Sequence, residues 1–177
     1  KPIDLGKTLH SSLEMLRPML NKNIYLEFVE PDEPVVIEAD AVQLERVVSN
    51  LCVNARDAML EGGKLRIEIE RVLVDEEFAT NNPELSVGPH ARFSITDTGE
   101  GISAEKLGHI LDPFYSTKDV GEGTGLGLAV VHGIISQHGG LIEVESKLGR
   151  GTRFSVTLPE SQAQEQDEKN PPRHVLQ

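Results

Sequence analysis

The sequence is poor in several features, and each deficit excludes a class of protein. Its single cysteine, Cys52, allows neither an internal disulfide nor a cysteine-based zinc cluster. No apolar run approaches the roughly 18 residues of a membrane span, and residues 1–20 mix charged with apolar side chains, unlike a signal peptide. Basic residues number 17 against 29 acidic ones, and the net charge of −12 argues against nucleic acid as a partner. A reducing, cytoplasmic setting fits these features.

The length of 177 residues, of which 38% are hydrophobic, is enough for one domain with a sizeable core. Because the chain begins with Lys-Pro rather than Met, we expect it to be part of a longer protein. Residues 160–177 are polar and rich in Gln and Glu, which is typical of a linker.

The spacing of apolar residues predicts the order of helices and strands. Helices are expected over residues 4–20, 41–60, 104–111 and 125–138, strands over 24–30, 35–38, 64–74, 91–97, 141–146 and 152–158, and a polar loop over 75–89. Three strands alternate apolar with charged residues, so the sheet should be covered on one face only. The predicted fold is α+β: a two-layer sandwich of a mixed, mostly antiparallel sheet with helices packed on one face.

The helix over residues 41–60 has an unusual polar face. Asn50, Asn54 and Asp57 share this face in successive turns. Asparagine is a poor helix former, so a purely solvent-facing role is only one of two interpretations. The other is a polar wall that offers oxygen ligands to a hard cation. Cys52 lies on the opposite, apolar face and is predicted to be a core residue.

A carboxylate ends the apolar stripe of the strand over residues 91–97. Phe93, Ile95 and Asp97 share one face of the strand because side chains alternate. An inward carboxylate needs a partner, and the amino group of an adenine would supply one; a turn or capping role is the alternative. Gly99 and Gly101 follow directly, and twelve of the 16 glycines lie between residues 99 and 151. Such glycines allow close approach of backbone to a ligand.

A second glycine cluster runs from Gly121 to Gly127 and leads directly into a helix. Backbone N–H groups at a helix N-terminus suit phosphate oxygens. The segment before it has few apolar anchors, so residues 117–124 are expected to be a lid that is disordered without nucleotide.

In this order and spacing, the motifs resemble those of the catalytic and ATP-binding domain of sensor histidine kinases, of the superfamily shared with gyrase and the mismatch-repair ATPases. The resemblance covers residues 21–158. Its parts are an asparagine box at Asn50–Ala58, glycine boxes at Asp97–Ile102 and Gly121–Gly127, a phenylalanine box at Asp112–Lys118, and a glycine-threonine turn at Gly149–Thr152. The residue sequence Asn-Ala-Arg-Asp-Ala-Met, which begins at Asn54, is similar to that of sensor kinases of the nitrogen-sensor type. The resemblance implies a Bergerat-type ATP-binding fold.

The resemblance also implies residue roles, with ATP and Mg²⁺ as cofactors. Asn54 would coordinate the Mg²⁺ that bridges the phosphates, with Asn50 and Lys118 acting beside them. Asp97 would accept a hydrogen bond from the adenine amino group. The other implied nucleotide-binding residues are Gly99, Gly101, Ile102, Thr117, Gly121, Gly123, Thr124, Gly125, Leu126, Gly127 and Thr152.

Two positions of the asparagine box refine this expectation. Hydrolysing relatives carry a Glu where this chain has Asn50, and an amide cannot take a proton from water. The sequence therefore favours phosphoryl transfer over hydrolysis. Many sensor kinases have a basic residue where this chain has Asp57, so no cationic phosphate contact is assigned there; Arg56 is expected to face elsewhere.

The phosphoacceptor is expected outside this chain. In the family, an acid normally follows the acceptor histidine, and none of the six histidines here is followed by one. They are therefore predicted to be structural or exposed. The expected organisation is a junction helix at residues 1–20 from an upstream dimerisation and histidine domain, an ATP-binding domain at 21–159, and a tail at 160–177. Residues 173–176 resemble the start of a response regulator receiver domain, which would then follow in the same polypeptide.

The resemblance implies transfer of the ATP γ-phosphoryl group to the upstream histidine. The full-length protein would be a homodimeric two-component kinase. Its catalytic domain would lie in the cytoplasm, whether or not the whole protein is anchored in a membrane. Two alternatives share the fold: an anti-sigma-type serine kinase and a non-catalytic nucleotide-binding module. The complete phenylalanine box weighs against the first, and the intact Asn54, Asp97 and glycines weigh against the second.

Overall fold

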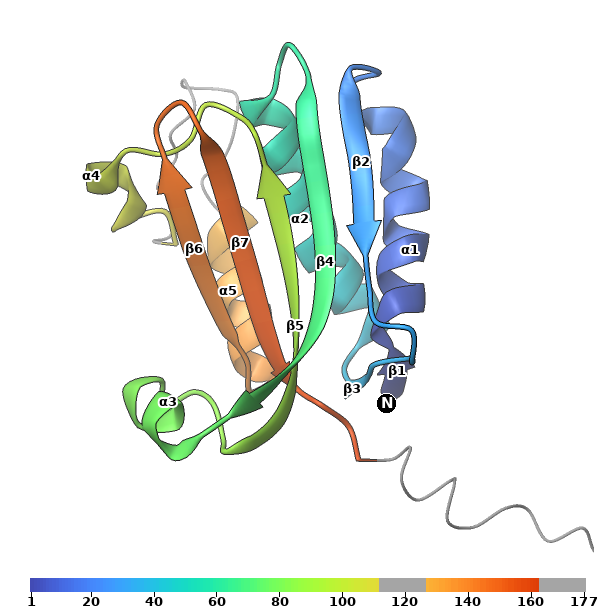
Figure 1. The fold of residues 1–177 in the computed structure, drawn as a ribbon, viewed down its shortest axis with the longest axis vertical. Coiled ribbons are helices and arrows are strands. Elements are labelled where there is room, and N and C mark those ends of the chain that lie inside the picture. Colours follow the sequence, from blue (N-terminus) through green and yellow to red (C-terminus); the bar gives the residue numbers. More distant parts are fainter. Residues whose placement is uncertain (112–126, 163–177) are drawn as a thin grey trace, which may run out of the picture.

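The computed structural model describes residues 1–111 and 127–162. In this part of the chain a sheet lies in front of three helices (Figure 1). The strands are β1 (Pro2–Asp4), β2 (Ile24–Val29), β3 (Val36–Glu38), β4 (Gly63–Val74), β5 (Gly88–Asp97), β6 (Leu141–Lys147) and β7 (Gly151–Pro159), and the helices are α1 (Leu5–Leu16), α2 (Ala41–Ala58), α3 (Glu76–Asn81), α4 (Ala104–Leu107) and α5 (Gly127–Gln137), with a 3₁₀ helix at Arg17–Met19.

The main sheet has the strand order β2-β4-β5-β7-β6. The edge strand β2 pairs with β4 in parallel, and the remaining neighbours are antiparallel. β1 and β3 form a separate two-stranded antiparallel sheet. The predicted mixed, mostly antiparallel sheet is confirmed.

The hydrophobic core lies between this sheet and α1, α2 and α5, which all cover the same face (Figure 1). The leucines of α1 that recur at steps of four, Leu5, Leu9 and Leu13, are buried in it. This helix is thus an integral part of the core, while its continuation toward an upstream domain stays a prediction. Cys52 is buried, and the burial raises the pKa of its thiol to about 12. The prediction that Cys52 is a core residue is confirmed.

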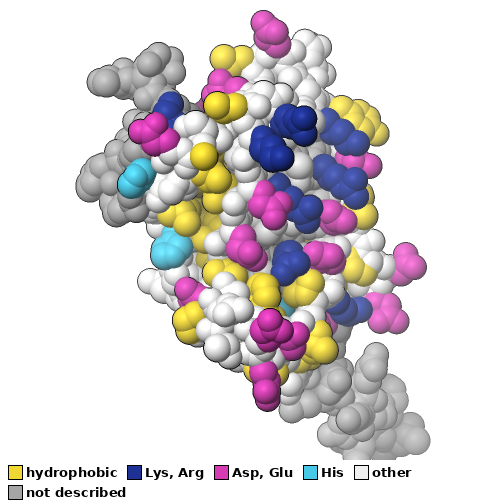
Figure 2. Space-filling view, turned by 60° about the vertical axis from the view of Figure 1, so that its left-hand side comes forward, with side chains coloured by type: hydrophobic (Ala, Val, Ile, Leu, Met, Phe, Trp, Pro, Cys, Tyr) yellow, Lys and Arg dark blue, Asp and Glu magenta, His cyan; other side chains and the backbone are white. Residues whose placement is uncertain are grey.

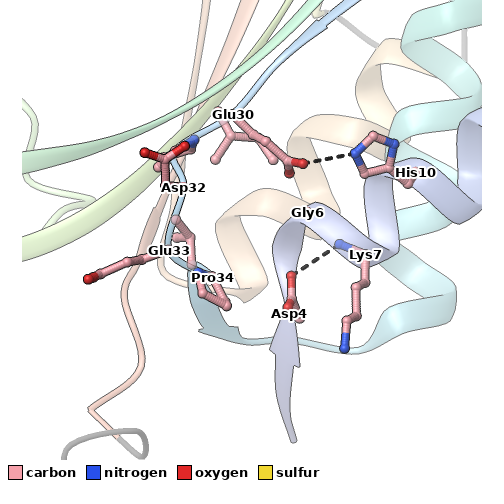
Figure 3. Close-up of a pocket in the computed structure, with 11 residues that line it drawn as sticks. Asp4, Gly6, Lys7, His10, Glu30, Asp32, Glu33 and Pro34 are labelled. Carbon is pink, nitrogen blue, oxygen red and sulfur yellow. Dashed lines mark hydrogen bonds and ion pairs between the residues drawn. The ribbon is translucent and has the colours of Figure 1, made fainter.

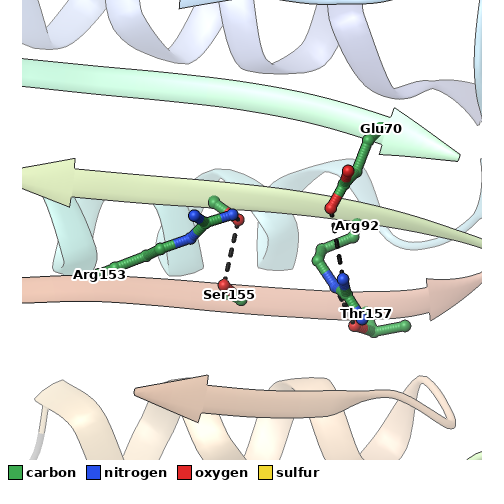
Figure 4. Close-up of polar contacts among 6 residues, drawn as sticks. Glu70, Arg92, Arg153, Ser155 and Thr157 are labelled. Carbon is green, nitrogen blue, oxygen red and sulfur yellow. Dashed lines mark hydrogen bonds and ion pairs between the residues drawn. The ribbon is translucent and has the colours of Figure 1, made fainter. Parts of the chain in front are cut away.

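The opposite face of the sheet is polar and charged. Lys64 on β4 pairs with Glu27 on β2 at 2.9 Å, and Arg92 on β5 pairs with Glu70 on β4 at 3.3 Å and donates to the Thr157 hydroxyl on β7 (Figure 4). Figure 2 shows basic and acidic side chains interspersed over one side of the molecule. Opposite charges on neighbouring strands therefore pair across this face, which no helix of residues 1–111 and 127–162 covers.

The structure differs from the sequence expectation in a few elements. The first helix ends at Leu16, followed by the 3₁₀ turn, because Pro18 lacks the N–H that a continuing helix needs. The predicted polar loop contains α3, which the Asp75 carboxylate caps through the Phe78 N–H at 2.8 Å. β1 was not predicted, α4 is shorter than expected, and β5 begins at Gly88 rather than at residue 91.

Candidate nucleotide-binding site

The polar face of α2 supplies the first part of the site. Asn50 and Asn54 lie one turn apart, and both are half-buried. The Asn50 side-chain amide donates to the Gly127 carbonyl at the start of α5, at 3.4 Å. The structure therefore brings Asn50 and Gly127, two residues assigned to the phosphate end of the site, next to each other.

A charged pair follows the two asparagines on α2. The Arg56 guanidinium donates to Asp57 Oδ1 through Nε at 3.2 Å and through a terminal nitrogen at 3.1 Å. Neighbouring residues of a helix point about 100° apart, as expected for Arg56 and Asp57, and the long Arg56 side chain bends toward Asp57 to make this contact. The pair is about one-third exposed, so its contribution to stability is small.

Asp97 ends β5 with its side chain on the core side of the sheet, together with Phe93 and Ile95, as the strand period predicts. Only 6% of its surface is exposed. Its Oδ1 accepts from the Gly99 N–H at 2.9 Å and from the Thr152 N–H at 3.3 Å. Burial raises the pKa of this carboxyl above its usual range, and the two N–H donors offset part of that rise. Both hydrogen bonds end on the same oxygen, so the other, Oδ2, is the one suited to a ligand donor.

A hydroxyl network holds the surroundings of Asp97. The Ser146 hydroxyl accepts from the Ile102 N–H at 2.8 Å and donates to the Gly151 carbonyl at 2.9 Å. It also lies 2.7 Å from the Thr152 hydroxyl. Sequence reasoning missed Ser146, although the period of β6 puts it on the same face as the buried Ile142.

Two glycines predicted to let backbone approach a ligand are required by contacts within the protein. A Cβ on Gly99 would lie 2.5 Å from the Ala58 carbonyl at the end of α2. Gly101 has φ +74°, and a Cβ there would overlap the Lys147 carbonyl at the end of β6. The loop after β5 is therefore held between the end of α2 and the β6–β7 turn, where the Gly149 N–H donates to the Glu100 carbonyl at 2.7 Å.

The remaining predicted site residues, in the lid and the second glycine box, lie outside the described residues: Thr117, Lys118, Gly121, Gly123, Thr124, Gly125 and Leu126. The predictions of a mobile lid and of a phenylalanine box also fall there. They stay predictions.

A pocket of about 200 Å³ lies elsewhere, at the N-terminal end of α1 (Figure 3). Its lining includes Asp4, Glu30, Asp32 and Glu33, and the Glu30 carboxylate pairs with His10 at 3.1 Å. This concentration of carboxylates repels phosphate groups, so the pocket does not compete with the site at Asp97 as a nucleotide site.

Three of the histidines are engaged in structural contacts. His10 stacks on Phe28 with ring centroids 3.9 Å apart. The buried His90 bonds the Gly88 carbonyl through Nδ1. His138 bonds the Ile134 carbonyl through Nδ1 and accepts from the Asp40 N–H through Nε2 at 3.2 Å, which joins the end of α5 to the start of α2.

The described part of the chain contains no group of three or more His, Cys, Asp or Glu side chains placed to hold a metal ion. In residues 1–111 and 127–162, no helix is both long and apolar enough to cross a membrane.

Comparison with known proteins identifies the family. The model of the family described as histidine kinase-, DNA gyrase B- and HSP90-like ATPase matches residues 39–162. The chain is 39% identical over 157 residues to the sensor kinase CckA of Brucella abortus, covering 89% of this chain and 17% of that protein. The structure of the catalytic domain of histidine kinase ThkA matches with a TM-score of 0.73 and 28% identity, covering 90% of this chain and 95% of that one.

A full-length structure of ShkA in complex with AMPPNP matches with a TM-score of 0.70 and 25% identity, covering 91% of this chain and 31% of that one. The chain spans only a sixth to a third of the length of the curated relatives described as sensor kinases. The family model covers most of the chain, and the five-stranded mixed sheet with helices on one face is the fold of the matching catalytic domain. The chain therefore belongs to the histidine kinase-, DNA gyrase B- and HSP90-like ATPases, and it is an ATP-binding catalytic domain of the sensor histidine kinase type.

Proposed function

We propose that this domain binds Mg²⁺-ATP and transfers the γ-phosphoryl group to a histidine on an upstream domain of a longer, homodimeric sensor kinase. The observation that carries the proposal is the Asp97 carboxylate, buried at the end of β5 with two backbone donors on one oxygen. A buried carboxylate with a free acceptor site suits the 6-amino group of adenine.

The residues at the phosphate end suit a magnesium nucleotide. Asn54 offers one neutral amide oxygen, which is a weak ligand alone, so Mg²⁺ would bind together with the phosphates that complete its octahedral coordination. The chemistry that it would supply there is neutralisation of part of the negative charge on the phosphates. Gly127 at the start of α5 and the glycines before it would direct backbone N–H groups toward the phosphates. Asn50, Lys118 and Thr117 are proposed to contact the same end.

The chemistry requires no general base from this domain. A neutral imidazole attacks through its unprotonated nitrogen, so a P–N bond forms while the bond from the γ-phosphorus to the bridging oxygen breaks, and ADP leaves. The proton on the other ring nitrogen is then released to water or to a carboxylate beside the acceptor histidine. Asn50 cannot deprotonate a water molecule, which disfavours the competing hydrolysis. In this proposal the domain positions the nucleotide, and the acceptor comes from the upstream hairpin.

The partners proposed are the upstream dimerisation and histidine domain and a response regulator receiver domain, which residues 173–176 would begin in the same polypeptide. The cytoplasm is the proposed setting for this domain.

The proposal is tested by mixing this chain with a separate fragment that carries the upstream histidine hairpin, in the presence of radiolabelled Mg²⁺-ATP. The hairpin should become labelled, slowly, because no linker raises the effective concentration of the acceptor. The label should be lost in acid and kept in base, as a phosphoramidate is. An acid-stable label on a serine would contradict the proposal, and so would the absence of label after prolonged incubation.

A further inference from the structure

The Ser146 hydroxyl is the centre of a small polar network beside Asp97. Its oxygen lies 2.8 Å from the Ile102 nitrogen, 2.9 Å from the Gly151 carbonyl oxygen and 2.7 Å from the Thr152 hydroxyl oxygen. These three groups come from the loop after β5 and from the start of β7, the two segments that flank the Asp97 side chain.

Either hydroxyl could donate in the contact between Ser146 and Thr152, and counting the available protons and lone pairs assigns a direction to each bond in this network. A serine hydroxyl has one proton to donate and two lone pairs that accept. The Ile102 N–H can only donate and the Gly151 carbonyl can only accept, so together they use one lone pair and the proton of Ser146. The arrangement that leaves every group matched has the Thr152 hydroxyl donating its proton to the second lone pair of Ser146.

This direction determines what Thr152 can offer on its other side. Because its proton is engaged by Ser146, the Thr152 hydroxyl has only lone pairs left for a ligand. The Thr152 N–H is also engaged, with Asp97 Oδ1 at 3.3 Å, and the residue is 5% exposed. The floor of the site at Asp97 and Thr152 therefore presents acceptors alone.

We propose that Ser146 is a positioning residue which, through Thr152, determines that this site accepts adenine and rejects guanine; the inference rests on the proposed ATP-binding function. Adenine carries a donor amino group at position 6, whereas guanine carries an acceptor carbonyl there. A guanine carbonyl facing the Asp97 carboxylate and the Thr152 lone pairs would leave buried polar groups without partners, which is costly.

The test compares the dissociation constants of ATP and GTP for the 177-residue chain by calorimetric titration. In Ser146→Ala the Thr152 hydroxyl is free to rotate and donate to the guanine carbonyl. We expect the preference for ATP over GTP to fall about five- to tenfold, the effect of about one hydrogen bond. A loss that was equal for both nucleotides would indicate a purely structural role and would overturn the proposal.

Further variants distinguish an effect of the hydroxyl network on the nucleotide preference from a general loss of stability. Ser146→Thr keeps a hydroxyl and should keep the wild-type preference. Ser155→Ala removes a hydroxyl from the opposite face of the sheet, where it lies 3.1 Å from Ser94, and should leave the preference unchanged (Figure 4). In a Thr152→Val background, Ser146→Ala should have no further effect on the preference.

Thr152→Val also provides a test that does not depend on the folding of the Ser146 variants. It removes the acceptor itself, so the preference for ATP should fall, and an unchanged preference would overturn the proposal. If the wild-type chain bound no ATP, the proposed function and this inference would both be wrong. If the wild-type chain bound ATP tightly and Ser146→Ala kept the same preference for ATP over GTP, the role of Ser146 would be contradicted and the proposed function would stand.

Discussion

At the scale of single residues, Asp97 combines a stability cost with a binding role. Burial raises the pKa of its carboxyl above the value of about 3.9 in an unfolded chain, so the folded domain holds this proton more tightly. As pH rises from about 4 through the folded pKa, the carboxylate ionises in a buried place, and stability is lost. At neutral pH the domain without nucleotide therefore carries an unfavourable charge.

This cost predicts opposite effects of Asp97→Asn on stability and on binding. At pH 7 the variant should unfold at a higher urea concentration than the wild type, and the difference should shrink as pH falls toward 4. ATP should bind about 10- to 100-fold more weakly, because a charged hydrogen bond to the adenine is lost. Urea titrations at several pH values and calorimetry with ATP measure both effects.

Asp40→Asn is the matched control, because Asp40 is exposed and asparagine caps a helix equally well. It should show neither the gain in stability nor the loss of binding. An Asp97→Asn variant that is less stable than wild type at pH 7 would contradict the assigned cost.

Asn54→Ala tests the metal assignment on α2. Without the amide oxygen, phosphotransfer to the histidine fragment should be abolished, while adenosine binding, which involves no phosphate, should largely survive. Gln43→Ala, three turns earlier on the same helix face, should keep phosphotransfer. Assays with labelled ATP measure phosphotransfer, and calorimetric titrations measure adenosine binding. Kinase activity in Asn54→Ala would refute the role of this residue.

Single residues could be predicted wherever a short-range period decides their orientation. The strand period placed Asp97 inward, and the helix period placed Cys52 in the core, as observed. Ser146 was missed because its importance depends on Ile102 and Thr152, and the contact with Ile102 joins residues 44 positions apart. The ion pair between Arg56 and Asp57 could not be predicted, because a helical wheel describes the Cα–Cβ direction and not the reach of a long side chain.

At the scale of elements, the loop after β5 depends on a glycine at position 101. Gly101→Ala should destabilise the domain by about 2 kcal/mol or more, because it combines the strain of a positive φ with overlap on the Lys147 backbone. Gly149→Ala is the matched control, since Gly149 has φ +77° but no atom within 4 Å of an added Cβ. It should cost only about 1 kcal/mol. Equal losses in urea unfolding would contradict the packing argument.

The first helix is expected to be essential for stability. Leu9→Ala removes a fully buried side chain from α1 and should cost about 2–5 kcal/mol. Met15→Ala, on the exposed side of the same helix at 72% exposure, should change stability by less than about 0.5 kcal/mol. Urea unfolding of the two variants measures the difference, and a Leu9→Ala variant as stable as wild type would contradict the burial of α1 in the core.

Long periodic elements such as α2 and β4 could be predicted from the sequence, whereas short ones could not. β1 has three residues and exists through its pairing with β3, which no local pattern encodes. α3 has six residues and lies in a polar segment without an apolar period, and its observed start depends on the Asp75 cap.

At the scale of the whole molecule, the layer arrangement followed from one simple pattern. The alternation of apolar and charged residues on β4 predicted a sheet with one covered face, and α1, α2 and α5 all lie on that face (Figure 1). The parallel pairing of β2 with β4 could not be predicted in this way, because alternation gives the face of a residue but not the neighbour of a strand.

The chain by itself should neither label itself nor hydrolyse ATP appreciably. Asn50 supplies no base for water, and no histidine in the sequence is followed by an acid. Incubation with radiolabelled Mg²⁺-ATP, followed by gel analysis and measurement of released phosphate, checks both expectations. Hydrolysis that survives further purification and disappears in Asn54→Ala would show that this site activates water after all.

The contact between Asp97 and Thr152 spans 55 residues of chain. During synthesis on the ribosome, β5 emerges long before β7, so the nascent domain exposes an unpaired carboxylate and one side of the future pocket with no opposite wall. Nucleotide can stabilise the chain only after the last hairpin has been made and has paired with β5. Products truncated before residue 152 therefore gain nothing from cellular ATP, and ATP would protect completed chains from proteolysis while leaving truncated ones to be degraded.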